Sequence, residues 1–114
     1  MPENSLMNYK VKTIPNFDKA LKRLAKKYAS LKSEYIALLY SLESDPQQGI
    51  SLGNNCYKIR LAIASKNKGK SGGARVITHV LIRNKTVFLL DIFDKSEQES
   101  IRDKELMMLI KEIQ

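Results

Sequence analysis

The 114-residue chain has little of the chemistry that disulfides and metal sites need. It contains one cysteine, Cys56, and one histidine, His79, so it can form neither an intrachain disulfide nor a zinc cluster. No segment approaches the roughly 18 apolar residues of a membrane span, and the first ten residues lack the apolar core of a secretory signal. We therefore expect a cytoplasmic protein that has no membrane contact, no metal and no cofactor.

Acidic residues are missing from the middle of the chain. Between Pro46 and Leu90 there is no aspartate or glutamate, whereas eight lysines and arginines fall in the same segment. They are Lys58, Arg60, Lys66, Lys68, Lys70, Arg75, Arg83 and Lys85. This segment alone equals the net charge of the whole chain, +8. Such a concentrated excess favours an anionic partner, with nucleic acid ahead of a membrane surface.

What is present describes an ordinary folded domain. Hydrophobic residues make up 43% of the chain and charged residues 28%, which is typical of a globular protein with a real core. A chain of this length supports one core, so we expect a single domain over residues 1–114.

The first half predicts one strand and two helices. Alternation over residues 8–14 indicates a short edge strand that stops at Pro15. Asn16 is expected to cap a helix, because apolar residues then recur at helical spacing. The two predicted apolar stripes are Phe17, Leu21, Leu24 and Tyr28, and then Tyr35, Leu38, Leu39 and Leu42. The second helix should end before Pro46, and the pair is expected to form an antiparallel hairpin.

The second half predicts three strands, at about residues 56–64, 74–83 and 86–93, with a basic glycine-rich loop at 65–73. In the last strand, Phe88, Leu90 and Ile92 are expected to face the core, with Leu89 facing away. If each strand buries its more apolar side against the helices, one polar face collects a set of mostly charged side chains. That set is Lys58, Arg60, Arg75, His79, Asp91, Phe93 and Lys95.

A last helix is expected near the C-terminus. Ser96 and Glu99 match a capping box, and residues 103–113 carry an apolar stripe of Leu106, Met107, Ile110 and Ile113. The predicted order is β-α-α-β-β-β-α. This is an α+β domain in which a small, mainly antiparallel four-stranded sheet packs against an N-terminal helical hairpin.

Three stretches, residues 56–62, 68–77 and 87–99, resemble the RelE/ParE superfamily of bacterial toxins, most of all its RelE- and HigB-type members. The resemblance implies a RelE-like fold and the toxin of a toxin–antitoxin system. It also implies an endoribonuclease that enters the ribosomal A site, cuts mRNA and so inhibits translation. A cognate antitoxin would hold it inactive, and for a HigB-like toxin that antitoxin would carry a helix-turn-helix domain.

The resemblance also implies which residues act. The family's basic positions correspond to Lys58, Arg60, Arg75 and Lys95. RelE-type enzymes often have a tyrosine where this chain has Ile101, and HigB-type relatives often have an aromatic residue at the place of Phe93. Neither Ile101 nor Phe93 can exchange a proton.

Cations suit RNA cleavage because RNA carries its own nucleophile, the 2′-hydroxyl. The protein need only align it and stabilise the negative charge of the transition state. For the base, Lys58 would need a lowered pKa. His79 needs no such shift, but it lies four residues, roughly 13 Å, beyond Arg75 in a regular strand, and Asp91 is a further candidate.

Other residues are expected to bind RNA without reacting. Lys66, Lys68 and Lys70 would contact phosphates. Phe93 would stack on a base, although burial under the last helix is an alternative.

Two other functions remain open. One is a ParE-like inhibitor of DNA gyrase, against which Lys58, Arg60 and Lys95 argue, since ParE-type members tend to lack this basic set. The other is an RNA- or ribosome-binding protein without catalysis.

Overall fold

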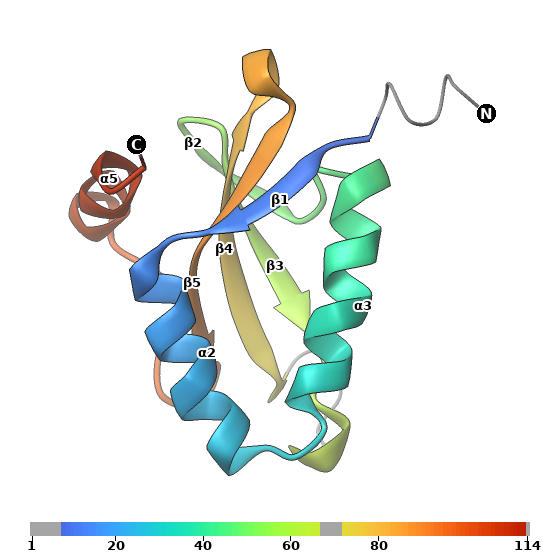
Figure 1. Cartoon of the computed structure of the whole chain (residues 1–114). Coiled ribbons are helices and arrows are strands. Elements are labelled where there is room, and N and C mark those ends of the chain that lie inside the picture. The colour runs from blue at the N-terminus through green and yellow to red at the C-terminus, as the bar shows by residue number, and fades with distance from the viewer. Residues whose placement is uncertain (1–7, 67–71, 114) are drawn as a thin grey trace.

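The computed structural model of the protein describes residues 8–66 and 72–113. Its five-stranded sheet has the order β1-β5-β4-β3-β2, and three α-helices accompany it (Figure 1). The strands are β1 (Lys10–Thr13), β2 (Ile50–Gly53), β3 (Cys56–Leu61), β4 (Ala74–Leu81) and β5 (Thr86–Asp94). The helices are α2 (Pro15–Lys27), α3 (Leu31–Ser44) and α5 (Asp103–Lys111), with short 3-10 turns η1 (Ala64–Lys66) and η2 (Ile82–Asn84). The α+β class is confirmed.

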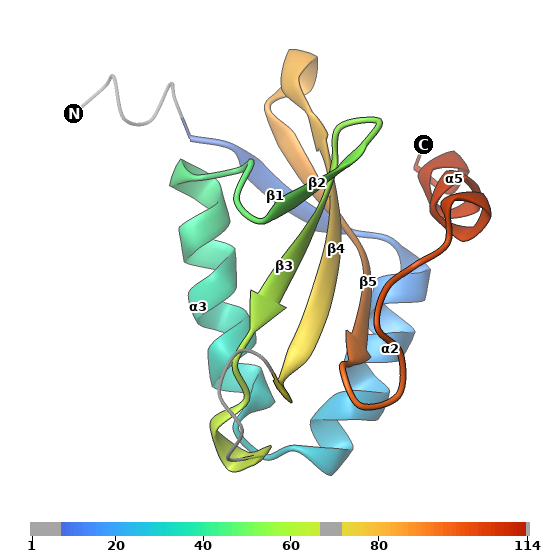
Figure 2. The ribbon, with the colours of Figure 1, turned by 180° about the vertical axis from the view of Figure 1, so that it is seen from behind.

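Helices α2 and α3 lie side by side over one face of the sheet, which we call the helix-covered face (Figure 1). Seen from behind, β3, β4 and β5 lie in front of these helices, and α5 stands to one side (Figure 2). The core forms between the layers, where Phe17, Leu24 and Leu42 are fully buried together with Val76 and Val80 of β4. Within the described part of the chain, no helix is both long and apolar enough to cross a membrane.

Helix α2 begins two residues earlier than predicted. Pro15 occupies its first turn and Ile14 the capping position, which suits proline because its missing N–H would have no helical partner there. Asn16 does not cap the helix; its Nδ2 donates to the carbonyl of Leu90, at 2.9 Å. This bond ties the start of α2 to the middle of β5.

The prediction of four strands is wrong by one. Strand β2 pairs antiparallel with β3, and the turn between them places Asn54 and Asn55 at φ of 54° and 60°. Two consecutive residues with positive φ are typical of the tight hairpin turn that asparagine tolerates. At the other edge, β1 runs parallel to β5, so the sheet is mixed.

A β-bulge in β5 changes which side chains face the core. Ile77 pairs with Asp91 but Thr78 pairs with Leu89, so Leu90 is an extra residue. An inserted residue moves the side chains on one side of it to the opposite face. Leu89 is fully buried and Phe88 only partly so, and the predicted orientation of these two residues is therefore wrong.

The predicted capping box at Ser96 is also wrong. The backbone N and Oγ of Ser96 bond to Oδ1 of Asp94, at 2.9 and 2.7 Å, and α5 begins only at Asp103. The buried residues of this helix are Leu106 and Leu109, whereas Met107 is 42% exposed. The stripe is thus rotated from the predicted one.

Candidate nucleic-acid interface

Four cations line one cavity on the face of the sheet opposite α2 and α3. Lys58 and Arg60 come from β3, Arg75 from β4, and Lys95 directly follows β5. The cavity has a volume of about 220 Å³, and its other lining residues are Ile50, Glu99 and Ser100. Arg60 and Arg75 are direct partners across the antiparallel β3–β4 pair, so their side chains leave the sheet on the same side. We call this the cationic cavity.

Arg75 is the most deeply placed of the four. It is 4% exposed, and its Nη1 donates to the carbonyl of Ala74 at 3.1 Å. Burial, and then the charge of Arg60, lower the pKa of Arg75, but an arginine stays protonated in proteins. The wall of the cavity therefore holds a positive charge with little water around it, where an anion would be bound strongly.

The rim of the cavity is polar and solvent-facing. Nζ of Lys58 donates to Oγ of Ser100 at 3.2 Å. Nζ of Lys95 lies 3.4 Å from Glu99, whose side chain is 85% exposed. Exposed ion pairs of this kind are weak, so Glu99 offsets little of the charge that the four cations bring.

The backbone of Lys95 is held by a close approach that requires glycine. Its N–H donates to the carbonyl of Gly73 at 3.0 Å. A Cβ at Gly73 would collide with the carbonyl oxygen of Leu61. The end of the glycine-rich loop therefore fits tightly between β3 and the residue that completes the cationic cavity.

A second cavity continues from the first past the edge of β3. It is lined by Gln48, Gly49, Ile50, Lys58, Ile59 and Arg60 and has a volume of about 400 Å³. Ile50, Lys58 and Arg60 line both cavities. An extended anionic chain would therefore find further space beside Arg60.

Lys66 lies in a different cluster, around the fully buried carboxylate of Asp94. Its Nζ pairs with Oδ1 of Asp94, and its side chain is only 10% exposed. Oδ2 accepts a bond from the hydroxyl of Tyr28 at 2.5 Å, and Nζ of Lys27 lies 3.9 Å from the same oxygen. We call Asp94, Lys66, Tyr28, Lys27 and Ser96 the Asp94 cluster.

The Asp94 cluster keeps its carboxylate ionised. Burial alone would raise the pKa of Asp94, but hydrogen bonds from Lys66, Tyr28 and Ser96 outweigh it and hold the pKa well below the usual range. The ammonium of Lys66 is thus occupied inside the fold and is not presented to a phosphate. Lys68 and Lys70, predicted to contact RNA with it, lie outside the described residues.

The other predicted residues do not line the cationic cavity. Nδ1 of His79 is 3.3 Å from Sγ of Cys56. Burial lowers the pKa of His79 and raises that of Cys56 to about 11, so burial favours the neutral form of both side chains. Asp91, whose pKa is raised by burial, lines a cavity beside α5. Phe93 is 3% exposed and does not present its ring for stacking.

Sequence reasoning missed three lining residues and the Asp94 cluster. Ile50 belongs to the missed strand β2. Glu99 and Ser100 lie in the loop after Lys95, and this closeness in the sequence could have indicated that they line the same cavity. Asp94 itself gave none, because a lone aspartate at a strand end is ordinary.

Comparisons with known proteins agree with this architecture. The family model for the RelE toxin of the RelE/RelB toxin–antitoxin system matches residues 18–113. The free Escherichia coli toxin RelE, in a double arginine-to-alanine mutant, shares the fold with a TM-score of 0.60 at 19% identity, over 95% of this chain and 100% of that one. The toxin–antitoxin complex RelBE2 from Mycobacterium tuberculosis matches with a TM-score of 0.54 at 12% identity, over 76% and 98%. No curated protein matches the chain.

Proposed function

Because the chain belongs to the RelE family of toxins from toxin–antitoxin systems, we propose that it is a metal-independent endoribonuclease that cleaves mRNA on the ribosome and so inhibits translation. The observation that supports this most is the cationic cavity, in which Lys58, Arg60, Arg75 and Lys95 surround one space. Four cations beside a single exposed carboxylate repel one another, so a sheet surface with only a structural role would not be expected to bring them together.

The proposed reaction is attack of the RNA's own 2′-oxygen on the adjacent phosphorus. The O2′–P bond forms, the P–O5′ bond breaks, and the cavity stabilises the extra charge on the phosphoryl oxygens. Arg75 and Arg60 are the proposed phosphate ligands, since guanidinium groups bind phosphate in a bidentate manner. Lys58 and Lys95 complete the set from either side.

Proton transfer is proposed to involve groups at the same cavity. The 2′-hydroxyl must lose its proton, and the departing 5′-oxygen must gain one. Besides the two arginines, Lys58, Lys95 and Glu99 are the titratable side chains that line the cavity. His79 and Asp91 lie elsewhere, and we therefore propose no proton transfer through them.

The test is to add the purified protein to mRNA with and without programmed ribosomes and to map the new 5′ ends. We expect cleavage that depends on ribosomes and that a Lys58→Ala/Arg60→Ala double variant loses. Message that stays intact with wild-type protein, or cleavage unchanged in the double variant, would contradict the proposal.

We also propose a cognate antitoxin as partner, as in the RelBE2 complex. The resemblance to HigB-type toxins suggests that this antitoxin has a helix-turn-helix domain. An acidic segment laid over the cationic cavity would neutralise it by charge complementarity. A gyrase inhibitor does not need four cations around one cavity, and it ranks below the nuclease. A non-catalytic RNA binder would use the same cations, and ribosome binding without mRNA cleavage would single it out.

A further inference from the structure

The second cavity, beside the cationic cavity, combines three kinds of side chain. We call it the Gln48 cavity, and its lining residues are Gln48, Gly49, Ile50, Lys58, Ile59 and Arg60. Ile50, Lys58 and Arg60 also line the cationic cavity, so the two spaces join. Ile50 is the register partner of Lys58, and partners across an antiparallel pair leave the sheet on the same side. Cations, an apolar wall and an amide are therefore contiguous at the edge of the sheet where β2 lies beside β3 (Figure 2).

The amide of Gln48 is fixed so that only its oxygen is available to a ligand. Its Nε2 donates to Oγ of Ser41 at 2.8 Å and to the carbonyl of Asp45 at 3.0 Å. A backbone carbonyl can only accept, so the second bond determines which end of the amide is nitrogen, and the two bonds use both of its N–H groups. Among the described residues, none donates to Oε1 of Gln48. The side chain can therefore offer the cavity an acceptor and no donor.

The turn that carries Gln48 packs directly on β3. A Cβ at Gly49 would lie 2.6 Å from the carbonyl oxygen of Lys58, and Gly49 has a φ of 100°, which other residues rarely adopt. The next residue, Ile50, is 55% exposed. Its aliphatic side chain and the planar guanidinium of Arg60 are surfaces on which a flat ring can pack.

The charges set the direction in which a nucleotide would lie. Lys58 and Arg60 stand where the Gln48 cavity meets the cationic cavity. On its other side, a third cavity of about 330 Å³ shares Gln48 and Arg60 with it and is also lined by Glu34. The lining residues of the three cavities include two acids, Glu34 and, at the rim of the cationic cavity, Glu99. Because Glu34 disfavours a phosphate at the far end, the phosphate is expected at the cations and the neutral base toward Gln48.

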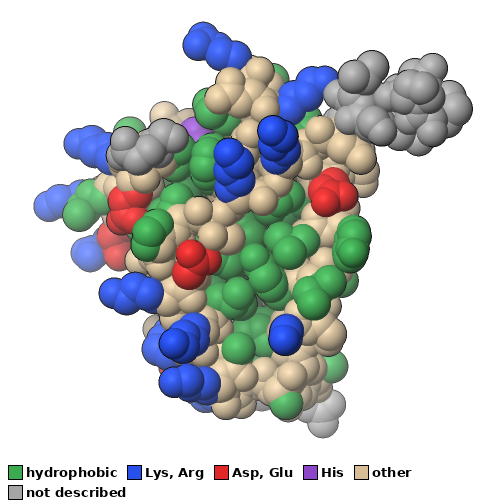
Figure 3. Space-filling view, in the orientation of Figure 1, with side chains coloured by type: hydrophobic (Ala, Val, Ile, Leu, Met, Phe, Trp, Pro, Cys, Tyr) green, Lys and Arg blue, Asp and Glu red, His purple; other side chains and the backbone are tan. Residues whose placement is uncertain are grey.

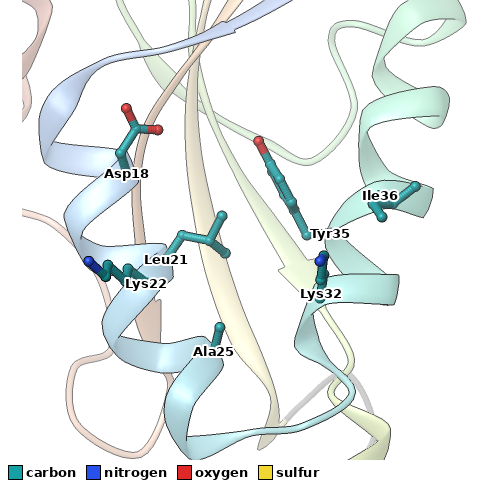
Figure 4. A pocket seen from close by; sticks show the side chains of 7 residues that line it. All are labelled: Asp18, Leu21, Lys22, Ala25, Lys32, Tyr35 and Ile36. Atoms are coloured by element: carbon teal, nitrogen blue, oxygen red, sulfur yellow. The ribbon is translucent and has the colours of Figure 1, made fainter.

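The apolar groove between α2 and α3 has different surroundings. It opens on the helix-covered face (Figure 3), and Figure 4 shows its lining side chains, which include Asp18 as well as Lys22 and Lys32. None of its lining residues lines the cationic cavity. It is therefore not a site for the base next to a phosphate that Arg60 and Arg75 hold.

We propose that the Gln48 cavity binds the base next to the scissile phosphate and that Oε1 of Gln48 selects adenine and cytosine over uracil. The inference rests on the proposed function for RNA as the substrate. Adenine and cytosine carry an amino group, which donates, where uracil carries a carbonyl oxygen, which would face Oε1 as a second acceptor. Ile50 and Arg60 pack against the faces of the ring, and because every base has such faces they add affinity without selecting.

The experiment measures binding of short 2′-deoxy oligonucleotides to the full chain by fluorescence anisotropy. These probes lack the reacting 2′-oxygen and therefore stay intact. One probe is a run of deoxyuridine with a central deoxyadenosine, and its counterpart has purine deoxyriboside at the centre, which is the same ring without the amino group. We expect the adenine probe to bind about three- to tenfold more tightly, the effect of one net hydrogen bond.

Two variants of Gln48 separate its oxygen from its role in the turn. Both Gln48→Met and Gln48→Glu remove the Nε2 bonds to Ser41 and Asp45. Gln48→Met also lacks an acceptor and should bind the two probes equally, whereas Gln48→Glu keeps an acceptor and should keep the preference for adenine. A looser turn alone would affect both variants alike.

Matched controls come from equally exposed neighbours. Gln47→Met alters an exposed residue of the same turn that does not line the Gln48 cavity, and it should keep the wild-type preference. Ile50→Ala should weaken both probes about threefold without changing their ratio. Ile82→Ala, at a residue 52% exposed in η2, should weaken neither. Thermal unfolding of each variant checks that the fold persists.

Several results would overturn the assignment. They are equal binding of both probes by the wild type, an unchanged preference in Gln48→Met, or loss of the preference in Gln48→Glu or Gln47→Met. Failure of the proposed nuclease function reads out separately, because mRNA would then stay intact on ribosomes while the preference for the adenine probe persists.

Discussion

Two clusters of cations lie near the end of β5, and they use their charge in opposite ways. In the Asp94 cluster, Lys66 and Lys27 surround a carboxylate that is fully buried. In the cationic cavity, four cations surround open space, and the carboxylate at the rim is 85% exposed. Adjacent residues in the chain, Asp94 and Lys95, belong to the two different clusters. The comparison teaches that the cations of the Asp94 cluster hold an anion of the protein itself, whereas those of the cationic cavity line a space that an anion from outside can enter.

The directions of the pKa shifts express the same difference. Lys66, Tyr28 and Ser96 lower the pKa of Asp94, so the folded state favours its charge. Burial and Arg60 lower the pKa of Arg75, so the folded state disfavours its charge. The Asp94 cluster therefore stabilises the fold. In the cationic cavity, the unfavourable electrostatic energy of Arg75 decreases when an anion binds.

The largest expected effect comes from removing the central anion of the first cluster. Asp94→Asn should lower the free energy of unfolding by about 3–5 kcal/mol, because Lys66 is left charged and buried without its partner. Urea unfolding measures this. Asp45→Asn, at an exposed residue, is the control and should stay within about 0.5 kcal/mol of the wild type. A similar small change in Asp94→Asn would remove the contrast between the clusters.

The same carboxylate predicts the response to acid. Because the pKa of Asp94 is lower in the folded state than in the unfolded one, its stabilisation is complete above the unfolded value of about 4 and is lost as the pH falls below it. Below about pH 4, wild-type stability should fall more steeply than that of Asp94→Asn, by up to about 1.4 kcal/mol per pH unit. Equal slopes would show that Asp94 is not the group responsible.

The second cluster predicts a dependence on salt. If four cations neutralise phosphates of single-stranded RNA, affinity should fall roughly 50-fold between 50 and 200 mM salt. Binding of RNA with a non-cleavable 2′-deoxy linkage measures this, and Lys58→Ala/Arg60→Ala should halve the logarithmic slope. A slope that the double variant leaves unchanged would place the RNA elsewhere on this basic chain.

The smallest expected effect concerns the rim. Glu99→Gln removes the exposed carboxylate beside Lys95 and should strengthen RNA binding by no more than about fivefold, as exposed pairs are worth up to about 1 kcal/mol. Glu112→Gln, at an exposed position on the end of α5, should change nothing in the same titration. Weaker binding in Glu99→Gln would mean that Glu99 orders the cavity.

Strand alternation predicted much of this arrangement. Because β3 and β4 are regular, the period of two places Arg60 and Arg75 on one face, and the position of Lys95 follows from the end of β5. The same argument failed at Phe88 and Leu89, because a bulge is a single inserted residue and the apolar pattern of residues 86–93 does not reveal it. It also missed β2, which is four residues long and has little apolar alternation.

Pairings between distant residues were beyond the sequence. From the sequence, Lys66 is one more lysine of a basic loop. Only the fold shows that it forms an ion pair with Asp94, 28 residues later. Cys56 and His79 likewise meet because they are register partners of β3 and β4. Local patterns predict faces and elements, whereas the identity of a partner depends on how the elements pack.

The most direct test of the central claim compares two arginines that differ in surroundings and not in chemistry. Arg75 is 4% exposed in the cationic cavity, whereas Arg83 is exposed in η2. In a single-turnover assay on programmed ribosomes, Arg75→Ala should slow mRNA cleavage by about 100-fold or more, the usual effect of losing one electrostatic donor to the transition state, and Arg83→Ala should cleave at the wild-type rate. Equal rates for the two variants, with both proteins folded, would contradict the claim that the cationic cavity performs the reaction.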